Sequence, residues 1–311
     1  MTITLKHLKK LDKETGRLKP VTLYLDGFLK SALDTLIYNI KNDWDFVIVI
    51  TGDRSVRTGK SVFGMTIGSY LADELNTPFS IDNIFFDSQS MIDNAQKMPK
   101  NSVLIYDEGR ESLASSKTMK SIQQDILDYF AECGQLNHIF IIILSDFFIL
   151  KEDIAVARSE MLLNVYRRET KVLLGEEKKA ILRFERGGFE LFNRYSKQKL
   201  YDISKSTRRR NYNLVKANTI GKFTNNYGAV DEKKYRKKKK ESLSRFNEKK
   251  KAELEAKLSK PNVFRNKVIM NLHKDGLSSR KIEAKLKLDY DFDISDRYIR
   301  RIIQANDENE Y

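Results

Sequence analysis

The residues with the clearest chemical potential are Gly59, Lys60 and Ser61, which close a polar loop after the apolar run 46–50. A helical pattern follows at once, since apolar residues recur every four positions at Phe63, Ile67, Leu71 and Leu75. Backbone N–H groups at a helix start attract anions, while a lysine and a serine at this spacing can reach phosphate oxygens and Mg²⁺. We therefore expect a phosphate-binding loop made of Arg57, Thr58, Gly59, Lys60 and Ser61. A surface turn without a ligand is the alternative, because Arg54 stands where the standard pattern has its first glycine.

A second group, Asp107 and Glu108, ends the short apolar run 102–106. Such a run is typical of a buried parallel strand, and the carboxyl ends of parallel strands are where open α/β sheets place ligands. We expect Asp107 to hold Mg²⁺ together with Ser61, and Glu108 to orient and activate a water molecule. A pair of surface carboxylates is the alternative, but it would not explain their position after the Gly-Lys-Ser segment.

Further candidates follow the next two apolar segments. Ser145 comes after the run 139–144, which is predicted to form a strand between the lysine strand and the Asp-Glu strand. Its hydroxyl could bond the water or the last phosphate, or it could cap the following helix. Arg158 ends a short predicted helix, where it could neutralise phosphate charge on its own or a neighbouring subunit, or lie on a solvated face. Arg57 is its rival for this role, and the sequence leaves the choice open.

The order of these elements resembles that of P-loop ATPases with an additional strand and a catalytic glutamate. It is most similar to the DNA-pumping members: the FtsK/HerA-type translocases, the Zot-like phage proteins and the phage packaging motors. The similarity covers roughly residues 43–166, and an arginine-bearing loop without the first glycine is similar to the packaging motors. The resemblance implies an α/β fold with a mostly parallel P-loop NTPase sheet flanked by helices. It also implies ATP and Mg²⁺ as cofactors and a homo-oligomeric ring.

Composition excludes several other classes of protein. Cys133 is the single cysteine, so disulfides and cysteine zinc sites are excluded, and His7, His138 and His273 have no metal-ligand spacing. The first residues lack the apolar run of a signal peptide, and the apolar region 139–150 is too short to span a bilayer. We expect a cytoplasmic protein, in the host cytoplasm if it is viral, with no direct membrane insertion. A portal or a membrane-associated protein is a further candidate partner.

Positive charge is concentrated in one segment. Nineteen Lys and Arg against six Asp and Glu between Ser204 and Lys260 carry +13 of the net charge of +14. Concentrated cations release counterions from a polyanion, so double-stranded DNA is the first candidate partner. An acidic membrane surface and a charged, flexible linker are the alternatives. The expected DNA contacts are Arg208, Arg209, Arg210, Lys237, Lys238, Lys239 and Lys240.

The chain divides into four predicted parts: an N-terminal arm or edge element (1–25), the ATPase core with a β extension (26–200), a basic linker (201–260) and a small all-α domain (261–311). Three short helices are predicted in the last part, the third beginning after Ser295. They resemble a helix-turn-helix of the resolvase or transposase type, which implies DNA contacts by Arg297, Arg300 and Arg301. A three-helix cap that binds protein is the alternative.

Together these patterns predict a DNA-dependent ATPase, either a DNA translocase or a genome-packaging motor of a virus or mobile element. A second hypothesis is an ATP-gated DNA-binding protein, such as an initiator, partition or regulatory factor, with slow hydrolysis. A kinase for small molecules is less consistent with the sequence, because it would leave the cationic segment unexplained.

Overall fold

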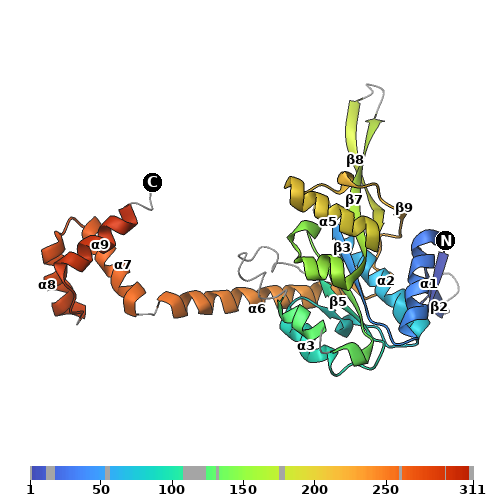
Figure 1. Ribbon diagram of the computed structural model, residues 1–311, viewed down its shortest axis with the longest axis horizontal. Coiled ribbons are helices and arrows are strands. Elements are labelled where there is room, and N and C mark those ends of the chain that lie inside the picture. The colour runs from blue at the N-terminus through green and yellow to red at the C-terminus, as the bar shows by residue number, and fades with distance from the viewer. Residues whose placement is uncertain are drawn as a thin grey trace. The chain divides into compact units, whose positions relative to one another are not determined.

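A seven-stranded sheet with the order β4-β5-β6-β3-β7-β8-β9 forms the middle layer of the first compact unit, Met1–Ser242, of the computed structural model (Figure 1). The structure describes residues 2–11, 18–52, 57–107, 124–130, 133–174, 179–258, 261–290 and 292–307. The sheet consists of β3 (Phe46–Gly52), β4 (Ile84–Phe85), β5 (Val103–Asp107), β6 (Ile139–Ile143), β7 (Ser159–Leu174), β8 (Lys179–Asn193) and β9 (Thr219–Lys222). The first five strands in sheet order are parallel, and β8 and β9 continue the sheet antiparallel. The predicted α/β class with a mostly parallel sheet is confirmed.

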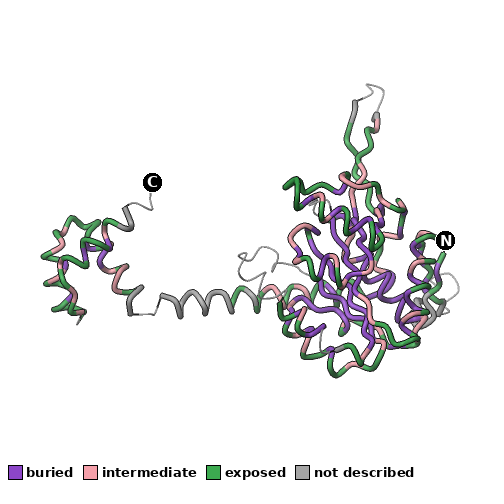
Figure 2. The backbone as a smooth tube through the Cα atoms, viewed as in Figure 1, coloured by how far each residue is buried: buried purple, intermediate pink, exposed green. Residues whose placement is uncertain are grey.

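Alternating apolar side chains explain why both faces of this sheet are covered. In β3, Ile48 and Ile50 join the hydrophobic cluster on one face, whereas Val47 and Val49 join the cluster on the other. Successive residues of a strand point to opposite faces, so a continuous β-branched run needs helices on both sides. Figure 2 shows the buried residues concentrated along these strands.

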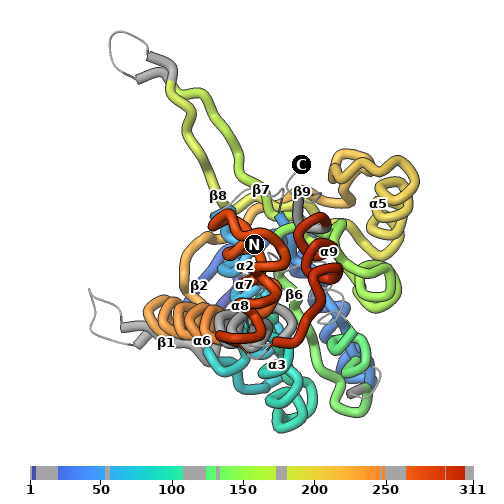
Figure 3. Tube along the Cα trace, turned by 90° about the vertical axis from the view of Figure 1, so that its left-hand side faces the viewer, coloured from blue at the N-terminus to red at the C-terminus, as the bar shows by residue number. Residues whose placement is uncertain are grey.

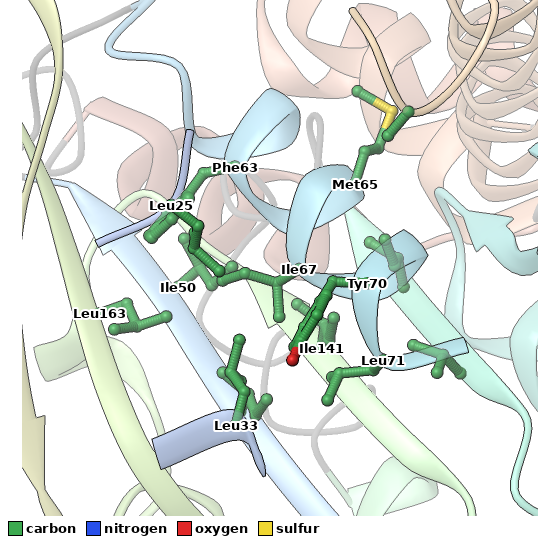
Figure 4. Packing of buried hydrophobic residues seen from close by; sticks show 14 of the residues in the cluster. Leu25, Leu33, Ile50, Phe63, Met65, Ile67, Tyr70, Leu71, Ile141 and Leu163 are labelled. Atoms are coloured by element: carbon green, nitrogen blue, oxygen red, sulfur yellow. The ribbon is translucent and has the colours of Figure 1, made fainter. Parts of the chain in front are cut away.

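Different helices cover the two faces of the sheet. On one face lie α1 (Gly27–Ile40) and α2 (Lys60–Leu75), whose buried residues pack on β3, β6 and β7 (Figure 4). On the other face lie α3 (Ser88–Ala95) and α5 (Arg194–Thr207). The side chain of Asp26 caps α1 by accepting from the N–H of Phe28 at 3.0 Å. This cap fixes the start of α1, the helix that precedes the first strand of the sheet.

Strand β6 lies between β3 and β5. Its Ile143 pairs with Ile50 of β3 on one side and with Asp107 of β5 on the other. This confirms the predicted additional strand between the lysine strand and the Asp-Glu strand. The arrangement brings the carboxyl ends of the three strands to one edge.

The N-terminal residues form an edge element. Strands β1 (Thr2–Leu11) and β2 (Leu18–Tyr24) pair antiparallel in a separate two-stranded sheet. Ile3, Val21 and Leu23 are buried and belong to the cluster that α1 and α2 cover. The sequence predicts either an arm or an edge element for residues 1–25. Over the described residues, the structure has the edge element.

The antiparallel pair β7 and β8 extends well past the parallel strands (Figures 1 and 3). The last pair between β3 and β7 joins Gly52 to Val165, whereas β7 and β8 stay paired out to Leu174 and Lys179. The predicted β extension is thus a long antiparallel hairpin, whose first strand begins at Ser159.

Residues 201–242 differ from the predicted basic linker. Helix α5 continues to Thr207, β9 joins the sheet beside β8, and Tyr212, Phe223 and Tyr235 are buried in the core. The chain divides into two compact units after Ser242, within helix α6 (Glu232–Leu258). The linker prediction is therefore wrong for residues 201–242, because isolated aromatic residues anchor this charged segment.

The second unit contains α7 (Pro261–Lys274), α8 (Ser279–Tyr290) and α9 (Asp296–Asp307). These helices share a small core made of Ile269, Leu272, Ile282, Leu286, Ile299 and Ile302. Gly276 has a φ of 81°, a left-handed conformation that suits glycine in the turn between α7 and α8. Helix α9 begins directly after Ser295, as the sequence predicts.

Candidate active site

The loop between β3 and α2 places a helix N-terminus at the carboxyl edge of the sheet. Gly59 has a φ of 102° and Arg57 a φ of 59°, so two left-handed residues turn the chain into α2. Among the described residues, no side chain caps the first turn of α2. The N–H groups of this turn, with the positive end of the helix dipole, therefore face the loop and suit an anion.

Lys60 lies over the end of β3. A Cβ atom built on Gly52 would stand 2.9 Å from the Lys60 Nζ atom and 3.2 Å from the carbonyl oxygen of Val165. Gly52 therefore leaves the space that the Lys60 side chain crosses. Gly52 was not among the predicted site residues, although a glycine at the end of a buried strand is a signal of close approach.

Thr58 supports a ligand in the loop. The residue is 1% exposed, and its Oγ1 atom makes no hydrogen bond within the described part of the chain. Buried hydroxyl groups are normally hydrogen-bonded, so an unpaired one marks the place of a further polar group. A phosphate oxygen beside the loop would supply that partner.

Asp107 and Ser61 meet at the hydroxyl group of Tyr235. This hydroxyl donates to Oδ2 of Asp107 and accepts from the Ser61 hydroxyl. Lys239 places its Nζ atom 3.3 Å from the same Asp107 oxygen. Burial and the Asp107 carboxylate raise the pKa of Tyr235, so its hydroxyl stays protonated and donates. The two predicted Mg²⁺ ligands thus lie within reach of one small group.

Glu108, the predicted base, lies outside the described residues. Ser145 follows β6 at the same edge as Asp107 and is exposed. The capping role considered for it belongs to Asp146, whose Oδ1 accepts from the N–H of Phe148 at 3.1 Å. Ser145 is therefore not used as this cap, and its hydroxyl lies at the edge where the sequence predicts a polar contact.

Arg158 is placed at the opposite edge of the sheet. It precedes β7, whose first residue pairs with Val47 near the start of β3. Its guanidinium donates to Asp45 at 3.1 Å and to the carbonyl of Phe130 at 2.6 Å. About 20 Å of strand separates this edge from Gly52, at about 3.3 Å per residue. The predicted role of Arg158 on the phosphates of its own subunit is therefore not supported.

Arg57 lies in a basic cleft beside the loop. The cleft has a volume of about 510 Å³ and is lined by Arg57, Arg167, Phe184, Arg186 and Asn225. The Arg167 guanidinium lies 4.0 Å from the centroid of the Phe184 ring, and Phe184 is 55% exposed. Three cations and an exposed aromatic face suit a flat, anionic ligand. Only Arg57 was expected here, because the others come from the hairpin and from the segment after β9.

The predicted DNA contacts fall into two groups. Lys238 donates to the carbonyl of Ile81 at 2.8 Å, and Lys239 contacts Asp107, so both face the core instead of a partner. Exposed positions are occupied by Arg208, Arg209, Arg210, Lys237, Lys240, Arg297, Arg300 and Arg301. Arg300 also pairs with Asp296 at 2.5 Å.

Comparison with protein-family models and with curated protein sequences finds no match to this chain. Over the described ranges, no helix is both long and apolar enough to cross a bilayer. Nor do three His, Cys, Asp or Glu side chains of those ranges gather around one point. A magnesium site completed by phosphates needs only one or two protein carboxylates, so the pair Ser61 and Asp107 is compatible with it.

Proposed function

We propose that the chain is a P-loop ATPase that acts on DNA, as a translocase or a packaging motor. The observation that carries this proposal is the meeting of Ser61 and Asp107 at one hydroxyl group beside the Lys60 loop. These residues come from α2 and β5, which lie far apart in the sequence. The strand order, with β6 between β3 and β5, supports the same type of fold.

The residues have separable roles in ATP hydrolysis. The α2 N-terminus and Lys60 bind and orient the phosphates, and Ser61 and Asp107 hold Mg²⁺, which neutralises phosphate charge when bound. Glu108 follows Asp107 directly and accepts the proton of the attacking water. Ser145 hydrogen-bonds that water or the last phosphate. The basic cleft at Arg57 receives the nucleoside.

The exposed arginines and lysines support DNA as the polyanionic partner. Phosphate contacts by such side chains make affinity fall steeply with salt, by a slope of about one per contact. A ring of subunits would place an arginine from one subunit near the phosphates of the next. Within one subunit, Arg57 of the phosphate loop is the better candidate for neutralising phosphate charge, since Arg158 is bound to Asp45.

The test is ATP hydrolysis, measured as phosphate release with and without duplex DNA, alongside the mass of the protein in solution. Lys60→Ala should abolish nucleotide binding. Glu108→Gln should keep ATP bound but stop hydrolysis, because it removes the base and leaves the phosphate contacts. Equal loss of binding in both variants would contradict these roles.

An ATP-gated DNA-binding protein with slow hydrolysis is the second candidate. The contact of Lys239 with Asp107 favours it, since a site held closed would turn over slowly. Hydrolysis that DNA barely stimulates, together with ATP-dependent DNA binding, would favour this candidate over a motor.

DNA binding has its own test, the fluorescence anisotropy of labelled duplex DNA over a series of salt concentrations. Arg297→Ala and Arg301→Ala should each lower the salt slope by about one, while the intact fold leaves ATP binding unchanged. Slopes equal to the wild-type slope would remove α9 from the DNA interface.

A further inference from the structure

The segment 223–239, here called the strap, crosses the carboxyl edge of the sheet at the candidate site. The Phe223 ring stacks on the Phe63 ring of α2 with centroids 4.1 Å apart. A Cβ atom built on Gly59 would stand 2.4 Å from the Oδ1 atom of Asn225, so the strap also abuts the phosphate loop. Tyr235 then reaches Asp107. The strap therefore contacts the first turn of α2, the phosphate loop and the end of β5.

At its far end the strap supplies a cation to the predicted metal ligand. Asp107 is 4% exposed, and a buried carboxylate needs a paired cation or hydrogen-bond donors. Lys239 gives a charge at 3.3 Å, and the hydroxyl of Tyr235 gives a hydrogen bond. Tyr235 is held in place by the rings of Phe86 and Tyr227, each with its centroid 5.7 Å away.

We propose that Tyr235 and Lys239 form a plug that stands in for the divalent cation, and that binding of a magnesium-nucleotide complex displaces it. This inference rests on the proposed ATPase function. Oδ2 of Asp107 accepts from both plug residues, so a metal ion bound by this oxygen and Ser61 would compete with them directly. Nucleotide binding is thereby linked to an opening of the strap.

The plug sits on the helix that carries the most concentrated positive charge. Lys237 and Lys240 are exposed on the same stretch of α6 as Lys239. Release of Lys239 from Asp107 adds a cation to this surface and frees the start of α6. The strap is therefore the element through which occupancy of the site alters the polyanion-binding surface.

The first test measures the affinity of a fluorescent, non-hydrolysable ATP analogue with Mg²⁺ and with EDTA. A ligand that must open a closed state binds more weakly in proportion to the open fraction. Lys239→Ala should therefore tighten binding with Mg²⁺ by about fivefold, the scale of a partly exposed ion pair, and should not tighten it in EDTA. Lys237→Ala is the matched control, because Lys237 lies on the same helix, is exposed and pairs with Glu241 at 4.0 Å. Weaker binding by Lys239→Ala, or the same affinity in both variants, overturns the plug.

The second test does not depend on a variant. Amide hydrogen exchange is followed over residues 232–242 of the full chain, before and after addition of Mg²⁺ and the analogue. The plug predicts faster exchange at these amides and slower exchange at residues 58–61. If the analogue protects 58–61 but leaves 232–242 unchanged or slower, the plug is refuted while the nucleotide site stands. If the wild-type chain binds no analogue, the proposed function fails, and the plug fails with it.

Discussion

Replacing Gly52 by alanine tests where the Lys60 ammonium acts. The new Cβ atom would stand 2.9 Å from Nζ of Lys60 and 3.3 Å from its Cδ atom. Contacts this short are not tolerated, so the flexible Lys60 side chain must move. The carbonyl oxygen of Val165, at 3.2 Å, must also give way by a few tenths of an ångström.

The size of the effect follows from Coulomb's law. Moving an ammonium from about 3 to about 4 Å from a phosphate oxygen, at an effective dielectric constant of about 20, removes about 1.4 kcal/mol. This corresponds to about tenfold weaker binding. The backbone contact with Val165 adds a loss of folding stability of about 1 kcal/mol, as in mild overpacking.

Equilibrium binding of the fluorescent ATP analogue and urea unfolding measure the two effects separately. Gly27→Ala is the matched control, because a Cβ atom at Gly27 has nothing within 4 Å. The control should keep wild-type affinity and stability. A Gly52→Ala variant that is folded and binds with wild-type affinity would refute the placement of the Lys60 ammonium over the end of β3.

Three further predictions follow from other parts of the structure. Arg158→Ala should lower stability to urea by about 1–2 kcal/mol, because it leaves Asp45 and the Phe130 carbonyl without their donor, and should leave nucleotide affinity unchanged. Phe184→Ala should weaken ATP binding about tenfold but not the binding of inorganic tripolyphosphate, measured by competition, since only a base can stack on the ring; equal losses for both ligands would place the nucleoside elsewhere. Burial lowers the pKa of Lys197 to about 7, so the unfolded state binds more protons above that pH, and stability to urea should rise by about 2 kcal/mol from pH 7 to 9. Lys197→Met should abolish this rise, and a persistent rise would assign it to another group.

The predictions that succeeded rest on local patterns with strong physical causes. An apolar, β-branched run followed by Gly59-Lys60-Ser61 and a helical pattern gave β3, its loop and α2 at their observed places. The run 139–144 is apolar at every position, as expected of a strand covered on both faces, and it became the central β6.

Arg158 shows a prediction that strand polarity could have corrected. A residue just before a parallel strand lies at the amino edge, while a residue just after one lies at the carboxyl edge. Since Arg158 precedes β7 and Asp107 ends β5, the two had to lie at opposite edges. The short helix predicted next to Arg158 did not indicate at which edge of the sheet Arg158 lies.

The position of the strap could not be predicted from local sequence patterns, for a different reason. Its anchors, Phe223 and Tyr235, are separated by mostly polar, small or charged residues, so no periodic pattern marks them. Strand β9 is four residues long and is fixed by its pairing with β8. Only Tyr235 gave a signal, as the one aromatic residue within the cationic run 233–240.

The lysines and the arginine of the run 233–240 have two possible uses, contact with DNA and neutralisation of Asp107. A count of cations cannot separate the two. A carboxylate buried as deeply as Asp107 must be neutralised, and the sequence assigns Mg²⁺ to that task. In the structure the cation is Lys239, which the sequence assigns to DNA. Both solutions satisfy the same electrostatic demand at one carboxylate, so we expect them to compete. If the proposed function holds, Lys239 should contact DNA only when another cation neutralises Asp107, so the two predicted ligands of this chain would be linked through a single carboxylate.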